Sequence, residues 1–384
     1  MKKGWETKTL GDIIKLEYGK PLDKSYRTPK GRFPVYGANG AIDRTDKFYH
    51  DKLSIIVGRK GSAGEINLTE KKFWPLDVTY FVTFEESQYD LRFLFYLLLT
   101  RELTTLAKGV KPGINRDEVY SQIAQVPPLP EQKRIVGILD EAFAGIATAK
   151  ANAEKNLQNA RAIFESHLNA VFTQRGDGWE EKTLGEVCDL QNGYAFKSGD
   201  YIKASNTLNI RMSNIRPGGN FDPEHNQRYL PDSYAKDYSA FLLSAGDLII
   251  AMTDMAGDPK ILGVPTLVGE LEGRNFLMNQ RVGKLFGFSA DVRPPYLRYF
   301  LTSPSVKQFY KSKGAGGLQV NISKGDILSV SIPLPNVSKQ NRVVEQLDEL
   351  SEETQHLTSL YERKLAALEE LKKSLLHQAF NGEL

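Results

Sequence analysis

The chain has 384 residues, too many for one ordinary hydrophobic core, so two or three domains are expected. Its composition, 41% hydrophobic and 25% charged, is typical of a soluble globular protein, and no run of about 18 apolar residues could span a membrane. The single cysteine, Cys188, excludes a disulfide within the chain and indicates a reducing, cytoplasmic location, while a net charge of +3 does not by itself indicate nucleic-acid binding.

The first segment, residues 1–130, is predicted to be a globular domain of mixed strands and helices. A turn at 37–40 follows an apolar run, and residues 53–57 and 78–84 read as strands. Residues 91–106 are predicted to form a core helix because they are apolar nearly all round. The proline-rich stretch 126–130 is expected to be a stiff connector that cannot hold a helix.

A long helix is predicted for residues 131–175, and the sequence contains this helix twice. Adding 208 to a position number in the first copy gives its partner in the second without a gap, so that Gln132 falls on Gln340 and Phe172 on Phe380. Apolar residues recur at steps of four and three in both copies, which predicts the seam of a coiled coil. This seam runs from Ile135 to Ile163 in the first copy and from Val343 to Leu371 in the second, and it is weak at Asn156, Thr354 and Lys364.

The second half of the chain repeats the first. The opening WETKTLGD at 5–12 returns as WEEKTLGE at 179–186, where the position numbers are higher by 174. The offsets 208 and 174 differ by 34, so the second globular segment, residues 176–336, is longer than the first by that number. A buried strand at 247–251 and a glycine loop at 314–321 match landmarks of the first segment, and a second helix fills 337–384.

The predicted fold is therefore α+β, with two α/β domains and two long helices that pack antiparallel as a coiled coil. A pseudo-twofold axis would relate the two copies. A helix of about 43 residues spans roughly 65 Å at 1.5 Å per residue.

The sequence shows no catalytic constellation. It has no Walker A pattern and no GxGxxG after a strand, and one cysteine with scattered histidines argues against a metal site. Arg293-Pro294-Pro295-Tyr296 is similar to the tail of an amino-methyltransferase motif, but that motif needs a first residue that accepts a hydrogen bond, and arginine cannot. The chain is expected to be non-catalytic.

Several loops combine glycine with Lys or Arg, which suits contact with phosphate, and carry Asn, Gln or Ser, which can read base edges. The candidate DNA-binding residues of the first domain are Lys20, Asn39, Arg59, Lys60, Ser62, Lys108, Lys111, Asn115 and Arg116. Those of the second domain are Tyr194, Phe196, Lys197, Arg211, Ser213, Asn214, Thr253, Lys313, Gln319, Asn321 and Lys324. Any one loop taken alone is more simply interpreted as ordinary surface, but similar loops at matching places in both domains favour a shared ligand-binding face.

In this order of domains and helices, the chain resembles the DNA specificity subunits of type I restriction–modification enzymes. The resemblance covers essentially the whole chain. It rests on the doubled opening motif, the proline connectors at 127–130 and 333–335, the helix starts at Gln132 and Gln340, and the FPVYGANG turn at 33–40. The chain departs from the pattern in its helix seam, which is alanine-rich in the first copy and carries larger residues in the second.

The resemblance implies that each globular domain reads one half of a split target in double-stranded DNA. The helix pair would set the spacer and bind two modification subunits, and restriction subunits would join the complex. S-adenosylmethionine, ATP and Mg would belong to those partners, so this chain is expected to hold no cofactor. The outer helix faces, with Asp140 and Asp348, are candidate partner surfaces, although solvated helix faces would look the same.

Two other classes of protein stay open. A structural adaptor would bind DNA weakly or without salt dependence, whereas a DNA reader with several phosphate contacts should show a steep salt dependence. A stand-alone DNA methyltransferase would need a cofactor loop that the sequence lacks. If the helices are a ruler, inserting four residues, about one turn, into one helix should change the spacer and leave both half-sites unchanged.

Overall fold

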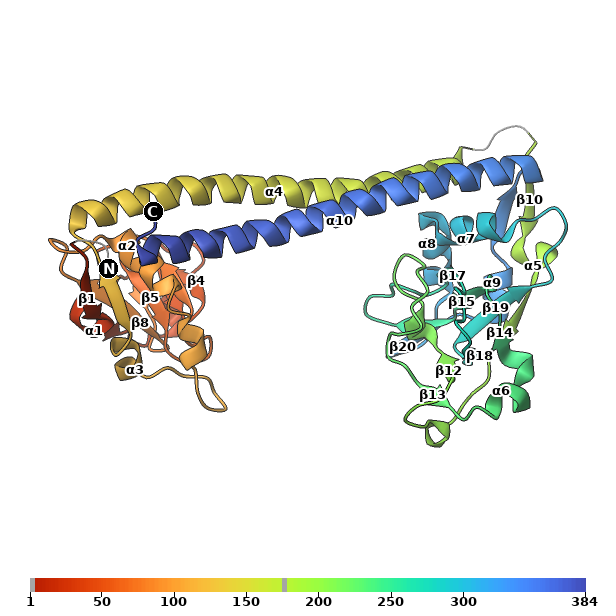
Figure 1. The fold of residues 1–384 in the computed structure, drawn as a ribbon, viewed down its shortest axis with the longest axis horizontal. Coiled ribbons are helices and arrows are strands. Elements are labelled where there is room, and N and C mark those ends of the chain that lie inside the picture. The colour runs from red at the N-terminus through yellow and green to blue at the C-terminus, as the bar shows by residue number, and fades with distance from the viewer. Residues whose placement is uncertain (1–3, 175–177) are drawn as a thin grey trace. The chain divides into compact units, whose positions relative to one another are not determined.

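A computed structural model describes residues 4–174 and 178–384 and forms two compact units (Figure 1). The first unit comprises Met1–Glu154 with Glu362–Leu384, and the second comprises Lys155–Tyr361. Each unit therefore contains one globular domain and a segment of both long helices. The predicted boundary between residues 175 and 176 lies outside the described residues.

The first unit is built from short strands around one four-stranded antiparallel sheet. Its strands are β1 (Glu6–Thr9), β2 (Ile14–Tyr18), β3 (Phe33–Gly37), β4 (Gly40–Thr45), β5 (Ile55–Gly58), β6 (Ile66–Leu68), β7 (Trp74–Pro75), β8 (Thr79–Phe84) and β9 (Ile123–Val126). The main sheet has the order β2-β8-β5-β6, and smaller sheets pair β4-β3-β7 and β1-β9. The buried strand predicted at 53–57 corresponds to β5, whose Ile55, Ile56 and Val57 are fully buried, but the strand begins two residues later than predicted and Leu53 is 43% exposed.

The helical segments of the first unit are short. They are α1 (Leu10–Ile13), α2 (Leu91–Leu99), α3 (Arg116–Tyr120) and the 3-10 turns η1 (Lys24–Tyr26) and η2 (Leu103–Leu106). The predicted core helix at 91–106 was therefore too long. Glu102 has a φ of +46°, a left-handed conformation that cannot continue a right-handed helix, so the chain turns before η2.

The second unit repeats this plan with more strands. They are β10 (Glu180–Thr183), β11 (Asp189–Asn192), β12 (Thr207–Ile210), β13 (Tyr229–Leu230), β14 (Leu242–Leu243), β15 (Leu248–Ala251), β16 (Thr253–Met255), β17 (Pro265–Leu267), β18 (Asn275–Met278), β19 (Val282–Phe286), β20 (Gln319–Asn321) and β21 (Ser331–Leu334). Its short helices are α5 (Leu184–Val187), η3 (Ser198–Asp200), η4 (Met212–Asn214), α6 (Tyr234–Asp237), η5 (Ser239–Phe241), α7 (Pro294–Thr302), α8 (Pro304–Lys313) and α9 (Lys324–Leu328).

The main sheet of the second unit, β11-β19-β15-β17, matches the order β2-β8-β5-β6 of the first. A second sheet, β13-β12-β18-β14, holds β12 and β18 side by side and parallel. The two-stranded pairs β10-β21 and β16-β20 complete the unit. The predicted duplication is thus present in the strand order as well as in the sequence.

The repeated opening motif builds the same structure twice. In the first unit, the backbone N–H and the hydroxyl of Thr9 donate to Asp12 Oδ2 over 2.9 and 2.6 Å. In the second unit, the same two groups of Thr183 donate to Glu186 Oε2 over 2.5 and 2.8 Å. The carboxylate thereby fixes the strand-to-helix turn, which explains why Thr and an acidic residue recur three positions apart.

The two long helices are α4 (Leu129–Thr173) and α10 (Val337–Asn381), each of 45 residues. They pair antiparallel in both units (Figure 1). In the first unit, Arg134 near the start of α4 donates to the carbonyl of Leu384 just past the end of α10, over 2.7 Å. In the second unit, Phe172 near the end of α4 shares a core with Leu347 near the start of α10.

The predicted connector needs a correction, because α4 already begins at Leu129 and includes Pro130. Proline is tolerated in the first turn of a helix, where its missing N–H would have no partner within the helix. Only residues 126–128 remain outside the helix at this connection.

The predicted seam holds in part. Ile135, Leu139 and Ala153 are buried, but the frame fails at Ile163 and Leu371, which are 50% and 47% exposed. Near Ile163, the neighbouring Phe164 packs against the core of the second unit instead. An average step of 3.5 residues falls about one residue behind a 3.6-residue helix over eight steps, so the buried stripe moves from Ile163 to Phe164.

Asp140 and Asp348, predicted on partner surfaces, tie each long helix to the core helix of its own unit. Asp140 accepts hydrogen bonds from the hydroxyl of Tyr96 over 2.5 Å and from Arg92 over 2.7 Å. Asp348 accepts a hydrogen bond from the Tyr299 hydroxyl and pairs with Arg298. Burial, together with the Asp348 contact, raises the pKa of Tyr299 to about 12, so this hydroxyl remains a donor at neutral pH.

Cys188 is expected to be unreactive in the folded chain. It is buried in the core of the second unit, and this burial raises the pKa of its thiol to about 12, so almost no thiolate exists at pH 8. Iodoacetamide at pH 8 should leave the native chain unmodified by mass spectrometry while it alkylates the chain in guanidinium. Equal alkylation rates in the two conditions would contradict the buried position.

Candidate nucleic-acid interface

In the first unit, two predicted arginines meet around an exposed tyrosine. Tyr18 ends β2 and is half exposed, Arg59 follows β5, and Arg116 opens α3. Both guanidinium carbons lie 5.4 Å from the centre of the Tyr18 ring. Three elements that are far apart in sequence thus present two cations and an aromatic ring on one face.

Arg59 is held in this position by the loop before β8. Its Nε and Nη2 donate to the carbonyl of Asp77 over 3.0 and 2.7 Å, and its backbone N–H donates to the carbonyl of Val78 over 2.9 Å. Tyr18 packs edge-on against Tyr80, whose pKa burial raises to about 12. The arginine and the ring are therefore fixed in place before any ligand arrives.

The other predicted cations of the first unit surround this face. Lys20 lies with its amine 5.0 Å from the ring centre of Tyr49. Lys60 pairs through its backbone with Gly113 in the late glycine loop, and Lys111 is exposed in the same loop. Lys108 forms an ion pair with Glu118 over 2.5 Å, so its charge is partly neutralised.

The remaining predicted residues of the first unit are polar. Asn115 is the N-cap of α3, where its side chain accepts from the backbone N–H of Asp117 over 2.9 Å. Asn39 and Ser62 are exposed in turns beside the end of β5. An added Cβ on Gly58 would lie 2.0 Å from the Ser62 carbonyl and 2.7 Å from that of Ala38, which places both turns next to this strand end.

The second unit keeps part of this arrangement at equivalent positions. Arg116 plus 208 is Lys324, which opens α9 as Arg116 opens α3, and the caps Asn115 and Ser323 match in the same way. The backbone hydrogen bond from Ile114 to Arg59 recurs from Ile322 to Met252. The loop that follows the central strand therefore pairs with the late glycine loop in both units.

A pair of glycines sets the close packing behind this face. Gly19 follows β2, and its counterpart Gly193, at the offset of the repeated opening motif, follows β11. An added Cβ would lie 2.0 Å from the Leu76 carbonyl at Gly19 and 2.2 Å from the Asn279 carbonyl at Gly193. At either position, only glycine lets the segment after the strand pass so close to the backbone of Leu76 or Asn279.

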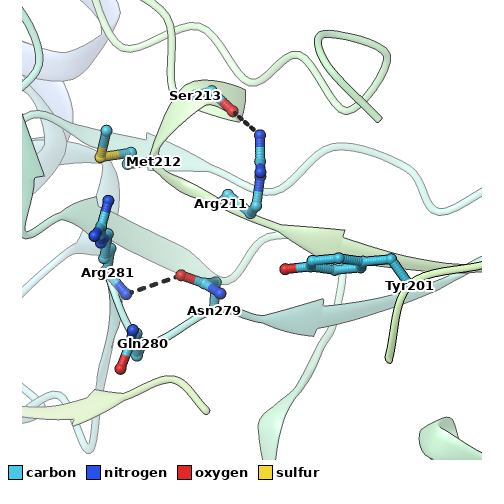
Figure 2. A pocket seen from close by; sticks show the side chains of 7 residues that line it. All are labelled: Tyr201, Arg211, Met212, Ser213, Asn279, Gln280 and Arg281. Carbon is cyan, nitrogen blue, oxygen red and sulfur yellow. Dashed lines mark hydrogen bonds between the residues drawn. The ribbon is translucent and has the colours of Figure 1, made fainter. Parts of the chain in front are cut away.

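A polar cavity of about 250 Å³ opens on the second unit (Figure 2). Because β12 and β18 are parallel neighbours, their carboxyl ends meet at one edge of the sheet. Polar residues follow both ends: Arg211 and Ser213 after β12, and Asn279, Gln280 and Arg281 after β18. Tyr201 and Met212 complete the lining.

Some hydrogen-bond donors and acceptors at this cavity have no partner or only a weak one among the described residues. Arg211 Nη2 donates to Ser213 Oγ over 3.4 Å, but its buried Nε makes no hydrogen bond within the described residues. Asn279 Oδ1 accepts a long, 3.3 Å bond from the backbone of Arg281 (Figure 2). Asn209, which is not a lining residue, donates to the hydroxyl of the lining Tyr201, and its own Oδ1 is buried and unpaired among the described residues. The site can therefore donate to and accept from a polar, planar group.

Comparison with known proteins decides the family. The family described as "Type I restriction modification DNA specificity domain" matches residues 2–158 and 176–369. The chain belongs to this family. It is a DNA specificity subunit of a type I restriction–modification system, with two target recognition domains, and it is itself non-catalytic.

Proteins of this family align with the chain over nearly its full length. The chain is 24% identical over 407 aligned residues to the type I restriction enzyme MjaVIII specificity subunit of Methanocaldococcus jannaschii, covering 99% of this chain and 93% of that one. A chain solved in a study of complex assembly and conformational transition of the type I R-M system is similar with a TM-score of 0.76 at 19% identity, covering 100% and 99%. The HsdS subunit from Thermoanaerobacter tengcongensis gives a TM-score of 0.57 at 19% identity, covering 100% and 98%. These structural likenesses concern the fold.

Three residues predicted to touch DNA are buried in this specificity subunit. Phe196 is buried in an aromatic cluster, and Asn214 is buried with its amide donating to the carbonyls of Asp222 and His225. Thr253 is buried and donates to Asn321 Oδ1 over 2.6 Å. The two polar side chains are already hydrogen-bonded and the aromatic ring is enclosed, so in this conformation the three side chains support the loops around them.

The other predicted residues of the second recognition domain lie at its surface. Tyr194 is partly exposed with its ring 4.6 Å from that of Tyr238, and Lys197 is exposed beside it. Lys324 forms a 2.6 Å ion pair with Asp189, and the Lys313 amine lies 5.6 Å from the Phe309 ring centre. In β20, Gln319 is partly exposed and Asn321 is exposed.

Prediction from sequence missed Tyr18, Tyr201 and the run Asn279-Gln280-Arg281. A signal existed for that run, since three polar residues directly follow the apolar strand β18. The motif-like Arg293-Pro294-Pro295-Tyr296 has a structural role, because Arg293 is the N-cap of α7 and the prolines begin that helix. Among residues 4–174 and 178–384, no group of three His, Cys, Asp or Glu side chains could hold a metal, and no helix combines the length and apolar character that crossing a membrane requires.

Proposed function

We propose that each recognition domain reads one half of a split DNA target through the face described above. The doubled layout is the main support: Arg116 in the first unit and Lys324 in the second open equivalent helices, and in both units the loop after the central strand pairs with the late glycine loop. The cavity of the second unit adds planar polar groups at the ends of β12 and β18. Residues 1–130 and 176–336 would be the two readers. Their loops differ, so the two half-sites should differ as well.

Within each face, charged and polar residues would divide the work. Exposed lysines, such as Lys20, Lys60, Lys111 and Lys197, would contact phosphates and supply affinity that does not depend on sequence. The planar donors and acceptors of the cavity, Arg211, Asn279, Gln280 and Arg281, would read base edges. Arginine pairs best with the two major-groove acceptors of guanine, and Asn or Gln with adenine.

The helix pair would set the spacer between the half-sites and bind two modification subunits, and restriction subunits would join the complex. Ile163 and Leu371, which hold equivalent positions in the two helix copies, are apolar and exposed on α4 and α10, as partner contacts would be. S-adenosylmethionine, ATP and Mg would bind to those partners. The single free cysteine is consistent with action in the cytoplasm.

Replacing Arg281 by alanine is expected to relax recognition at one base pair of the second half-site only. A bidentate arginine–base contact is worth about 1–3 kcal/mol, so discrimination at that position should fall by about 5- to 150-fold. The chain, assembled with its modification subunits, would methylate a randomised duplex library, and the methylated molecules would be sequenced.

The matched control is Arg228→Ala, an exposed arginine of the same unit outside the cavity, which should leave both half-sites unchanged. A change in the first half-site would contradict the assignment of one domain to one half. If the Arg281→Ala variant discriminated between bases as well as the unchanged chain, Arg281 and its cavity would not read the second half-site. DNA binding without salt dependence would instead favour an adaptor and reject the reading function itself.

A further inference from the structure

Each unit exposes one aliphatic side chain at the tip of its late glycine loop. Val110 in the first unit is 108% exposed, and Leu318 in the second is 88% exposed. The two residues are related by the same offset as the long helices, and each follows a glycine, Gly109 or Gly317. Single exposed apolar residues are common, but two at one place in a duplicated fold are an unusual coincidence.

In both units, a pair of backbone hydrogen bonds closes the loop and holds its tip rigidly. In the first unit, Lys108 and Gly113 exchange backbone hydrogen bonds of 3.0 and 3.1 Å, which leaves only 109–112 as the tip. In the second unit, Ala315 and Asn321 exchange bonds of 3.1 and 2.9 Å around 316–320. Neither aliphatic side chain has folded back onto its own domain, although both loops are fixed next to the main sheet.

The backbone at the second tip is bonded as well. The Leu318 carbonyl accepts from the N–H of Ala256 over 3.2 Å, so the side chain projects from an ordered backbone. Met255, which pairs with Gln319 in the β16-β20 ladder, is also exposed beside this tip. The second tip therefore carries a larger apolar surface than the first.

Lysines flank both apolar tips, and this combination favours a binding partner that is a polyanion with an apolar interior. Lys111 is next to Val110, and the backbone of Lys60 pairs with Gly113 at the base of the same loop. Lys311 and Lys313 precede the second loop and are exposed. A hydrophobic protein pocket would gain little from flanking lysines, whereas duplex DNA offers phosphates outside and stacked bases inside.

We propose that Val110 and Leu318 each insert into the DNA as an apolar wedge that partly unstacks one base step in or beside its half-site. The proposal rests on the proposed function, because it assumes that these faces meet DNA. Aliphatic wedges inserted between base steps kink the duplex and let it contact more protein surface. The two wedges would act at equivalent places in the two half-sites, since the loops that carry them are equivalent.

The test uses the full chain with its modification subunits and a target duplex that carries 2-aminopurine at each position in turn, except the methylated adenine, which a methyltransferase itself flips out of the stack. This base becomes brighter when it is unstacked. With the unchanged chain, we expect a rise of several-fold at one step in each half-site. Leu318→Ala should abolish the rise in the second half-site only, Val110→Ala that in the first only, and Leu318→Met should retain it.

Affinity gives a second readout. Removing the three carbons of the Leu318 side chain beyond its Cβ should weaken target binding roughly 50-fold, the effect of losing about three buried methylenes. Leu53→Ala, an exposed leucine (43%) in a globular domain outside the proposed faces, is the matched control and should leave fluorescence and affinity unchanged. Because Val110 and Leu318 contact no core, thermal unfolding of both loop variants should match that of the unchanged chain.

Three outcomes would overturn the wedge. The first is a bound target with no bright position. The second is a loss of affinity on replacing thymine by uracil that equals the loss in Leu318→Ala, because the leucine would then contact a thymine methyl in the major groove. The third is equal brightness in the alanine variants. Failure of the unchanged chain to bind its target at all would reject the reading function instead.

Discussion

Replacing Gln340 by alanine is expected to lower the free energy of unfolding of the second unit by about 3–5 kcal/mol. Its side chain is fully buried at the start of α10 and joins three backbone groups. Oε1 accepts from the N–H of Arg293 over 2.9 Å, and Nε2 donates to the carbonyls of Asp291 and Pro335 over 2.8 and 2.7 Å. Alanine leaves these groups buried without partners, at about 1–3 kcal/mol for each lost bond.

The same network exists in the first unit around Gln132. Its Oε1 accepts from the N–H of Asp90 over 2.9 Å, and its Nε2 donates to the carbonyls of Gln88 and Pro127 over 3.0 and 2.9 Å. Gln132→Ala should therefore destabilise the first unit by a similar amount. The repeated glutamine joins the proline connector, the core helix and the long helix in each unit.

Denaturant unfolding combined with hydrogen exchange would measure both effects, because exchange localises the loss to one unit. Gln355→Ala, an exposed glutamine on α10, is the matched control and should change stability by less than about 0.5 kcal/mol. If Gln340→Ala were as mild as this control, its three hydrogen bonds would not hold α10 to the second recognition domain.

Lengthening both long helices by one heptad is expected to lengthen the unread DNA spacer by about three base pairs. Duplicating residues 148–154 in α4 and 355–361 in α10 adds roughly 10 Å to each at 1.5 Å per residue. One base pair rises about 3.4 Å along DNA, which gives the three base pairs. Seven residues preserve the heptad register of the seam, which a four-residue insertion in one helix would disturb.

Sequencing of sites methylated by the complex would report spacer and half-sites together. The control exchanges the same two heptads between the helices without changing their length, and it should leave the spacer unchanged. An unchanged spacer in the lengthened chain, or altered half-site bases with the original spacing, would mean that the helix pair does not measure the distance.

Local patterns were sufficient to predict much of the fold. The buried strands β5 and β15 are continuous apolar runs, and both long helices appear at their predicted positions because apolar residues recur at helical spacing. The core helix was predicted too long, since Glu102 adopts a left-handed conformation that apolar periodicity does not reveal. The predicted seam was wrong at Ile163, which is exposed, because the prediction used a 3.5-residue repeat and an α-helix has 3.6 residues per turn.

The candidate interface was harder to predict than the fold. Arg59 and Arg116 were found from their glycine loops, but nothing local indicates that both lie by Tyr18. Phe196 and Asn214 have the residue types of a DNA-binding loop, yet both are buried. Residue type predicts what a side chain can do, whereas exposure depends on segments far away in the chain.

The sequence by itself determined the duplication, the helix pair and the family, because repeats and periodicity are properties of order along the chain. Only the tertiary structure decided which polar residues share a face. The parallel pairing of β12 with β18 brings Arg211 to Asn279 and Arg281, which lie far later in the chain, at one cavity. The equivalent tips at Val110 and Leu318 likewise gain meaning only from their exposure, which depends on the packing of every other loop in their units.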